Sequence, residues 1–259
     1  MTRVEKPAAS GRRAVTVRIE VEALEGLPEV RPGDDLAALL AACSSPVPGE
    51  VLVVAHKVVS KAEGRVVALA DVEPSARARE LAEPWGKDPR QVEVVLRESA
   101  AVLRAERGVL ICRTRHGFVC ANAGVDASNA GARGELVLLP LDPDASARRL
   151  RAALPGRPAV VITDSFGRAW RHGQVDVAIG IAGLAPLEDW RGRPDAAGRE
   201  MRASWVAIAD EAAAAADLVR TKDGGLPAAI VRGLERHVTA EDGPGAAALL
   251  RPPTEDLFA

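Results

Sequence analysis

The chain has 259 residues, 47% of them hydrophobic, and its 34 basic and 36 acidic residues leave a formal net charge of -2. It is long enough to bury a substantial core, but its apolar stretches are interrupted by Gly, Pro or charge well short of the ~20 residues that a membrane-spanning helix needs. The balanced charge, the absence of Tyr and the presence of only three Phe argue against a general nucleic-acid-binding surface, and three cysteines without metal-ligand spacing argue against a disulfide framework.

Residues 1–13 are predicted to form a flexible N-terminal tail. These residues are polar and lack the apolar core of a secretory signal, so we expect a cytoplasmic protein. Apolar patterns predict strands over residues 15–21 and 51–55, with a helix between them that is capped at Pro32-Gly-Asp-Asp35 and runs to about Ala42. The patterns further predict a helix over residues 74–82 and strands over residues 91–96 and 108–113.

In the second half, Asp144 is predicted to cap a basic helix that ends near Leu154, and a buried strand follows over residues 159–163. A long helix is expected from Asp195 to the Gly224-Gly225 pair, and a last strand over residues 228–231. The long helix is predicted because apolar residues recur at helical spacing, at Met201, Trp205, Ile208, Ala212, Ala215 and Val219.

This alternation of strands and helices without one uniform repeat predicts an α+β, or mixed α/β, architecture. We expect one principal domain over residues 14–245, with two interleaved lobes as an option inside it, and a C-terminal tail over residues 246–259.

The most informative segment places Asp164 and Ser165 directly after the predicted buried strand, where they would reach the rim of a sheet. Asp126 follows another apolar run, and two carboxylates at one edge could share Mg²⁺ or Mn²⁺ with positions left open for phosphate oxygens. The alternative is that each Asp only caps a helix or a turn. Asn129 could pair with a nucleotide or fix a turn.

Cationic residues near these segments indicate an anionic ligand. Lys61 follows Ser60 after a strand and could grip phosphates, although the spacing of a P-loop is absent and a surface lysine is the other interpretation. Arg168, Arg171 and His172 suit an anionic substrate through bidentate arginine contacts, or form a solvated basic loop. The residues alone therefore favour a metal- and phosphate-handling enzyme.

A set of ordered segments between about Val15 and Gly233 resembles the coenzyme F420:L-glutamate ligase family, also called F420-0 gamma-glutamyl ligases. The segments that carry the resemblance are residues 59–65, 116–126, 163–168, 173–180, 189–192 and 225–233. The resemblance implies a two-lobed α+β fold, an intertwined homodimer, and GTP-dependent amide formation between a deazaflavin phospholactate (F420-0) and L-glutamate, with release of GDP and phosphate. It also implies Mg²⁺ or Mn²⁺ and a potassium ion.

The same resemblance assigns roles to residues. Asp126 and Asp164 would bind one metal, Ser165 would lie beside a second, Lys61 would add positive charge, and Arg168 or Arg171 would hold an anionic group of a substrate. The residues implied around GTP are Gly26, Leu27, Pro28, His56, Lys57, Lys61, Asn129, Arg220, Thr221, Lys222, Asp223, Gly224, Gly225, Leu226 and Pro227.

One departure from the family pattern concerns Lys222, which aligns near a ligand of the second metal although an ammonium cannot coordinate a cation. The main chain or Asp223 would then replace the ligand, or the second metal would be bound differently. The other functions considered are a related ligase for a different carboxylate, a phosphatase, and a GTP-binding regulatory protein without turnover.

Overall fold

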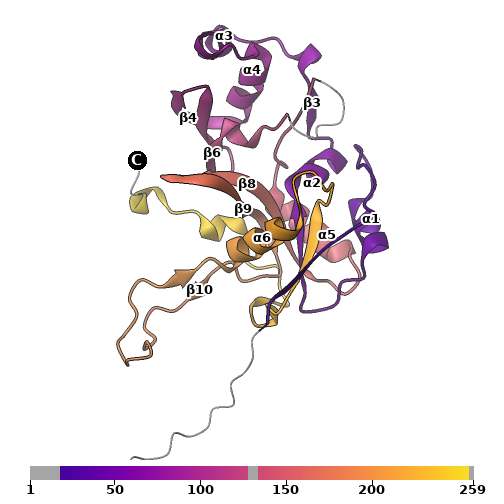
Figure 1. The fold of residues 1–259 in the computed structure, drawn as a ribbon, viewed down its shortest axis with the longest axis vertical. Coiled ribbons are helices and arrows are strands. Elements are labelled where there is room, and N and C mark those ends of the chain that lie inside the picture. The colour runs from indigo at the N-terminus through magenta and orange to yellow at the C-terminus, as the bar shows by residue number, and fades with distance from the viewer. Residues whose placement is uncertain (1–17, 128–133, 257–259) are drawn as a thin grey trace, which may run out of the picture.

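The strands β2 (Val51–Ala55) and β8 (Ala159–Arg168) lie at the centre of the structure, a computed structural model that describes residues 18–127 and 134–256. Val51 to Val54 and Ala159 to Ile162 are at most 1% exposed, as expected for strands of a sheet that is covered on both faces. The two strands pair in parallel. The full sheet has the order β1-β12-β2-β8-β9, in which β1 (Glu20–Ala23), β12 (Ala228–Arg232) and β9 (Arg171–Ala182) pair antiparallel to their neighbours (Figure 1).

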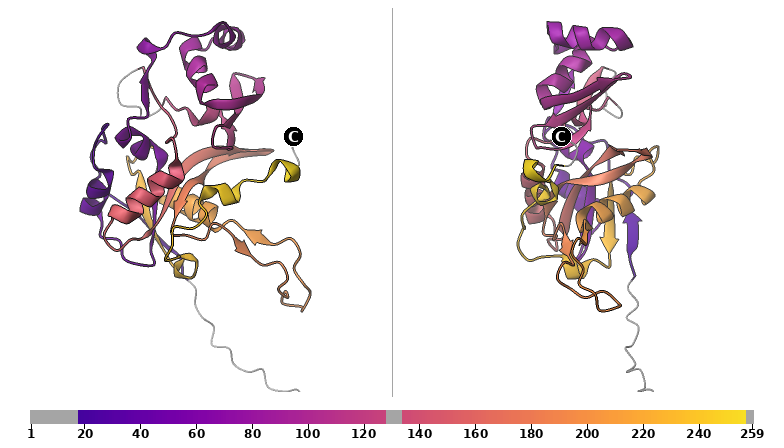
Figure 2. Two further views of the ribbon diagram at one scale, coloured as in Figure 1. Left: turned by 180° about the vertical axis from the view of Figure 1, so that it is seen from behind. Right: turned by 90° about the vertical axis from the view of Figure 1, so that its left-hand side faces the viewer.

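Helices cover both faces of this sheet. α6 (Ile208–Val219) packs across one face, and α5 (Pro143–Ala153) packs against β8 and β9 on the other (Figures 1 and 2). α1 (Leu36–Cys43) lies beside α5 and begins at Asp35, whose carboxylate accepts the Ala38 N–H at 3.0 Å. This is the N-cap arrangement that the sequence predicts at this position.

A second group of elements, here called the upper cluster, lies between residues 66 and 138 and forms the top of Figure 1. It has a hydrophobic core of its own, in which Val92, Leu110 and Leu136 are buried. Its helices and strands are β3 (Val66–Ala68), α3 (Ala76–Ala82), α4 (Pro89–Glu98), β4 (Ser99–Glu106), β5 (Val109–Thr114), β6 (Val119–Ala121) and β7 (Glu135–Val137). Short 3₁₀ turns in the described chain span Leu69–Asp71, Glu83–Trp85, Asn122–Gly124, Glu235–His237, Ala246–Leu249 and Pro253–Glu255.

The mixed α/β class is confirmed, and so are several elements to within one or two residues: the predicted strands over residues 51–55, 108–113 and 228–231 and the predicted helices near residues 36–42 and 74–82. The strand predicted over residues 15–21 overlaps β1, but its first part lies outside the described residues. No helix within the described ranges is both long and apolar enough to cross a bilayer.

The strand predicted over residues 91–96 is wrong, because this segment belongs to the helix α4. Asp88 caps the helix by accepting the Arg90 N–H at 2.9 Å, and Pro89 occupies its first turn. Valine favours strands, but here Val92 and Val95 lie on one face of the helix and are buried in the upper cluster. Tertiary burial and capping therefore outweigh the β-propensity of valine.

The long helix predicted from Asp195 is also wrong, because α6 begins only at Ile208. Residues 188–206 instead form an arm in which β10 (Glu188–Asp189) pairs with β11 (Trp205–Val206), and it projects from the body of the protein in Figure 1. Asp195 accepts the N–H groups of Ala197 and Arg199 at a turn. Pro194 and the positive φ of Gly192 and Gly198 explain why no helix forms here.

Asp144 does not cap α5, because that position is taken by Asp142, which accepts the Ala145 N–H at 2.8 Å. The Asp144 carboxylate instead accepts two N–H groups from other segments, Ile181 at 2.8 Å and Ala246 at 2.9 Å. Asp144 thus ties α5 to β9 and to the chain near the C-terminus.

Replacing Ile230 with alanine should lower the free energy of unfolding by about 2–5 kcal/mol, because Ile230 in β12 is fully buried and truncation leaves a cavity. Urea unfolding followed by circular dichroism measures the change. The control is Leu218→Ala in α6, since Leu218 is 84% exposed and its truncation should cost less than about 0.5 kcal/mol. An equal loss of unfolding free energy in the two variants would contradict the position of β12 in the core.

Candidate active site

The candidate site begins where β2 ends beside β8. The parallel pairing stops at Ala55 opposite Thr163, after which the chain of β2 turns directly into α2 (His56–Ala62). The predicted end of the strand at Thr163 is wrong, because β8 continues to Arg168 as an antiparallel hairpin with β9. Asp164 and Ser165 nevertheless lie just past the end of the parallel pair, at the start of α2.

A cleft of about 350 Å³ opens at this point. Its walls come from the segment before α1, the start of α2, the hairpin β8–β9 and the loop after α6. The lining residues are Leu27, Pro28, Glu29, Val30, Ala55, His56, Lys57, Val58, Lys61, Thr163, Asp164, Ser165, Asp176, Asp217, Arg220, Thr221, Lys222, Asp223, Gly225, Leu226 and Pro227.

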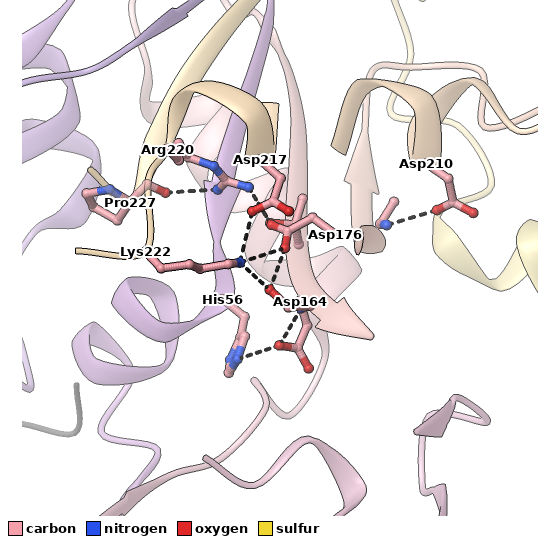
Figure 3. Close-up of polar contacts among 11 residues, drawn as sticks. His56, Asp164, Asp176, Asp210, Asp217, Arg220, Lys222 and Pro227 are labelled. Carbon is pink, nitrogen blue, oxygen red and sulfur yellow. Dashed lines mark hydrogen bonds and ion pairs between the residues drawn. The ribbon is translucent and has the colours of Figure 1, made fainter. Parts of the chain in front are cut away.

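Asp176 and Arg220 form a buried ion pair at the base of the cleft (Figure 3). Asp176 lies on β9 opposite Ser165 and also accepts hydrogen bonds from the hydroxyls of Thr163 at 2.9 Å and Ser165 at 2.5 Å. Burial lowers the pKa of Arg220, against the opposing effect of the Asp176 charge, but an arginine in a protein stays protonated. Arg220 is therefore a fixed positive charge.

Arg220 also holds the loop that follows α6. Its guanidinium donates to the carbonyl oxygen of Pro227 at 3.2 Å and to the Thr163 hydroxyl at 3.1 Å. One side chain thus ties both ends of the segment 220–227 to the strand β8.

The first two residues of α2 contact the two carboxylates that were predicted to share a metal. His56 is 1% exposed, and its Nε2 lies 3.3 Å from Oδ1 of Asp164. Lys57 follows it, and its Nζ lies 2.6 Å from Oδ2 of Asp126. The Ser165 N–H donates to Asp164 Oδ1 at 2.8 Å. Consecutive residues of one helix therefore bring Asp126 and Asp164 to the same end of α2.

These two carboxylates fit one divalent cation. Carboxylate oxygens are the ligands that Mg²⁺ and Mn²⁺ accept, and Mg²⁺ is usually held by only one or two of them, with water or phosphate completing its coordination. Within residues 18–127 and 134–256, no three His, Cys, Asp or Glu side chains gather as a closed metal-binding group. Asp126 and Asp164 are therefore the residues that could hold such a cation.

Lys61 is buried in the wall of the cleft, and its Nζ lies 2.6 Å from Oε1 of the largely exposed Glu29. The interpretation of Lys61 as a surface lysine is therefore wrong. Lys222 lies at the mouth, where its Nζ is 3.0 Å from the Ser165 hydroxyl and 2.9 Å from Asp217.

A cysteine nucleophile does not fit this site. Burial, and to a smaller extent the nearby Asp164 charge, raise the pKa of Cys120 to about 12. Burial also raises the pKa of Cys112, the partner of Cys120 across the strands β5 and β6. Both thiols therefore stay protonated near neutral pH, and the thiolate is the reactive form.

Most of the residues predicted around GTP and the metals line the cleft, but Gly26, Gly224 and the predicted metal ligand Asp126 do not. Asp126 lies beside the cleft, where it contacts the lining residue Lys57. Asn129 lies outside the described residues. Arg168 and Arg171 are exposed at the far end of the hairpin β8–β9, where Arg168 donates to the carbonyl oxygen of His172 at 2.6 Å. In this chain they are separate from the cleft.

Three lining residues were not predicted from the sequence as part of the site: Thr163, Asp176 and Asp217. A signal for Asp176 was present, since a carboxylate between two valines of an apolar strand needs partners when it is buried. Asp217 lay within a predicted helix, and no pattern distinguished it there.

Comparison with known proteins identifies the family of this chain. The model of the family described as F420-0:Gamma-glutamyl ligase matches residues 26–233, and the chain belongs to this family. It is 48% identical to the coenzyme F420:L-glutamate ligase of Methanopyrus kandleri over 94% of this chain and 98% of that protein. The proteins of the same name from Methanothermobacter thermautotrophicus and Archaeoglobus fulgidus are 43% and 47% identical, over 93% and 84% of this chain and 98% and 89% of their own lengths.

Replacing Asp176 with asparagine should lower the free energy of unfolding by about 3–5 kcal/mol, because it leaves the buried Arg220 guanidinium without its counter-charge. The control is Asp189→Asn, which breaks an Asp–Arg pair whose side chains are about half exposed and should cost about 0–1 kcal/mol. Urea unfolding compares the two, and a similar loss in both variants would contradict the role of Asp176.

Proposed function

We propose that this protein is a GTP-dependent coenzyme F420-0:L-glutamate ligase that joins L-glutamate to the lactyl carboxylate of a deazaflavin phospholactate and acts as a homodimer. The observation that carries the proposal is the position of the cleft within the family match. Every residue that lines the cleft, from Leu27 to Pro227, falls inside the matched range of residues 26–233. The relative from Methanopyrus kandleri, which is 48% identical to this chain, is named coenzyme F420:L-glutamate ligase.

The chemistry requires activation, because a carboxylate does not react with an amine at neutral pH. The carboxylate oxygen would bond to the γ-phosphorus of GTP while the bond to GDP breaks, which gives an acyl phosphate. The glutamate amine would then attack the acyl carbon, and inorganic phosphate would leave as the amide forms. A divalent cation held by Asp126 and Asp164 would offset the negative charge of the phosphate oxygens.

The charges of the cleft suit a polyanionic ligand. The wall carries four cationic side chains, those of Lys57, Lys61, Arg220 and Lys222. Lys57 and Lys61 are paired with Asp126 and the exposed Glu29, and phosphate oxygens would take over these donors as the nucleotide enters. Such positive groups stabilise charge that shifts during phosphoryl transfer because they are already oriented.

The direct test mixes purified protein with F420-0, L-glutamate, GTP and Mg²⁺ or Mn²⁺. We expect a product that is heavier by one glutamyl unit, together with an equal amount of GDP. Complete GTP hydrolysis without glutamate would indicate a phosphatase, and tight GTP binding without turnover would indicate a regulatory protein. Absence of any mass gain with either metal rules out the ligase.

Replacing Asp164 with alanine should reduce turnover by at least about 100-fold, which is the effect of removing one strong electrostatic contribution from an active site. Folding should persist, because Asp164 is partly exposed at the cleft. Steady-state kinetics and thermal melting measure the two effects. The control is Glu80→Ala in α3, whose salt bridge with Arg77 is exposed and whose activity should equal that of the wild type. Normal activity of the Asp164 variant would remove this residue from the mechanism.

Arg168 and Arg171 lie outside the cleft, and their proposed role is to hold an anionic group of F420-0 or glutamate that extends beyond it. Alanine at both positions should raise the apparent KM of one substrate by about 10-fold or more, since a hydrogen bond to a charged group contributes about 1.5–3 kcal/mol. The measurement is KM for each substrate in turn with the others saturating. Unchanged KM values for both substrates would show that the hairpin tip does not bind them.

A further inference from the structure

The ammonium group of Lys222 lies among oxygen atoms from three elements. It donates to the Ser165 hydroxyl of β8 at 3.0 Å and to the Asp217 carboxylate of α6 at 2.9 Å, and it lies 3.8 Å from Oδ1 of Asp176 on β9 (Figure 3). A hydroxyl and two carboxylates are hard oxygen donors, the kind that also surround metal cations.

The charges of this cluster balance with Lys222 in place. Asp176 is paired with Arg220 in the interior, and Lys222 is close to both Asp217 and Asp176. Two carboxylates thus face one guanidinium and one ammonium. A second metal ion at Ser165 would lie within a few ångströms of the ammonium, and like charges at such a distance repel strongly where water is partly excluded.

Lys222 cannot itself serve as a ligand, since a protonated lysine has three donors and no acceptor. Its position is set by the loop that it belongs to, which Arg220 anchors through the carbonyl of Pro227. The Lys222 side chain is 68% exposed and lines the cleft. The loop therefore places a covalently attached positive charge beside Ser165.

We propose that the Lys222 ammonium is a tethered cation that takes the place of a second metal ion beside Ser165, so that the protein binds a divalent cation only at Asp126 and Asp164. Its expected ligand partners are phosphate oxygens, and to that extent the inference rests on the proposed function. The replacement of a second metal ion by the Lys222 ammonium does not rest on the proposed function, because it concerns only the oxygen atoms that Lys222 contacts.

The test counts the Mn²⁺ ions bound per chain without nucleotide, from the electron paramagnetic resonance signal of free Mn²⁺ in a buffer whose monovalent cation is choline. Lys222→Met removes the ammonium while keeping an unbranched side chain, and it should bind one more Mn²⁺ than the wild type. The double variant Lys222→Met with Asp217→Ala should lose this additional ion. Lys87→Met, a lysine of the upper cluster outside the cleft, should match the wild type.

Equal Mn²⁺ counts for the wild type and Lys222→Met would overturn the proposal, and so would an additional ion that persists in the double variant, because it would then be bound elsewhere. Thermal melting verifies that each variant is folded. Since no nucleotide is present, the count is separate from the ligase assay. A gained ion together with failure of the ligase assay would reject the proposed function and support the role of Lys222.

Discussion

The buried ion pair between Asp176 and Arg220 is the interaction on which the candidate site depends. The pair joins two distant parts of the chain. Asp176 belongs to the hairpin β8–β9, and Arg220 begins the loop that forms one wall of the cleft. Taking such charges out of water costs several kcal/mol per ion unless each has close partners. Thr163, Ser165 and the Pro227 carbonyl supply those partners. Stability and the shape of the cleft therefore depend on the same contacts.

Three lysines of the cleft are each paired with a carboxylate. Lys57, Lys61 and Lys222 each lie within 2.9 Å of a carboxylate oxygen, from Asp126, Glu29 and Asp217 respectively. An ammonium that already has an anionic partner is held in position before a ligand arrives. If a phosphate oxygen replaced the carboxylate, as the proposed function requires, the partner of the ammonium would change but its position would not, which is the condition for electrostatic preorganisation.

The sequence predicted the parts of the fold that depend on local patterns. The continuous apolar run of β2 and the capping residue Asp35 were sufficient for the strand and for α1. α4 was missed because its valines favour strands, whereas its helical state depends on burial against elements distant in the sequence. The arm that ends at Trp205 was missed because a chance helical spacing of apolar residues outweighed Pro194 and two glycines.

The segments around Lys61, Asp164 and Arg220 were predicted from motifs and reach the cleft, whereas Asp126, Arg168 and Arg171 do not line it. Asp176 was not found, although its position between two valines was a signal, because its partner Arg220 is distant in the sequence. Asp217 was not found because nothing in the pattern of the helix that contains it marks it as part of a site. Lys222 was identified as a departure from the family pattern, and only its distances to Ser165 and Asp217 indicate what it does.

The parallel pairing of β2 with β8 has a consequence for how the chain folds. The two strands are separated in the sequence by α2, the whole upper cluster and α5, so their contact closes a long loop, and such non-local contacts form slowly. The upper cluster has its own core and many contacts between neighbouring segments, so it is the part that can order first. The cleft, which begins just past the last β2–β8 pair, is then completed only when the two ends of this long loop meet.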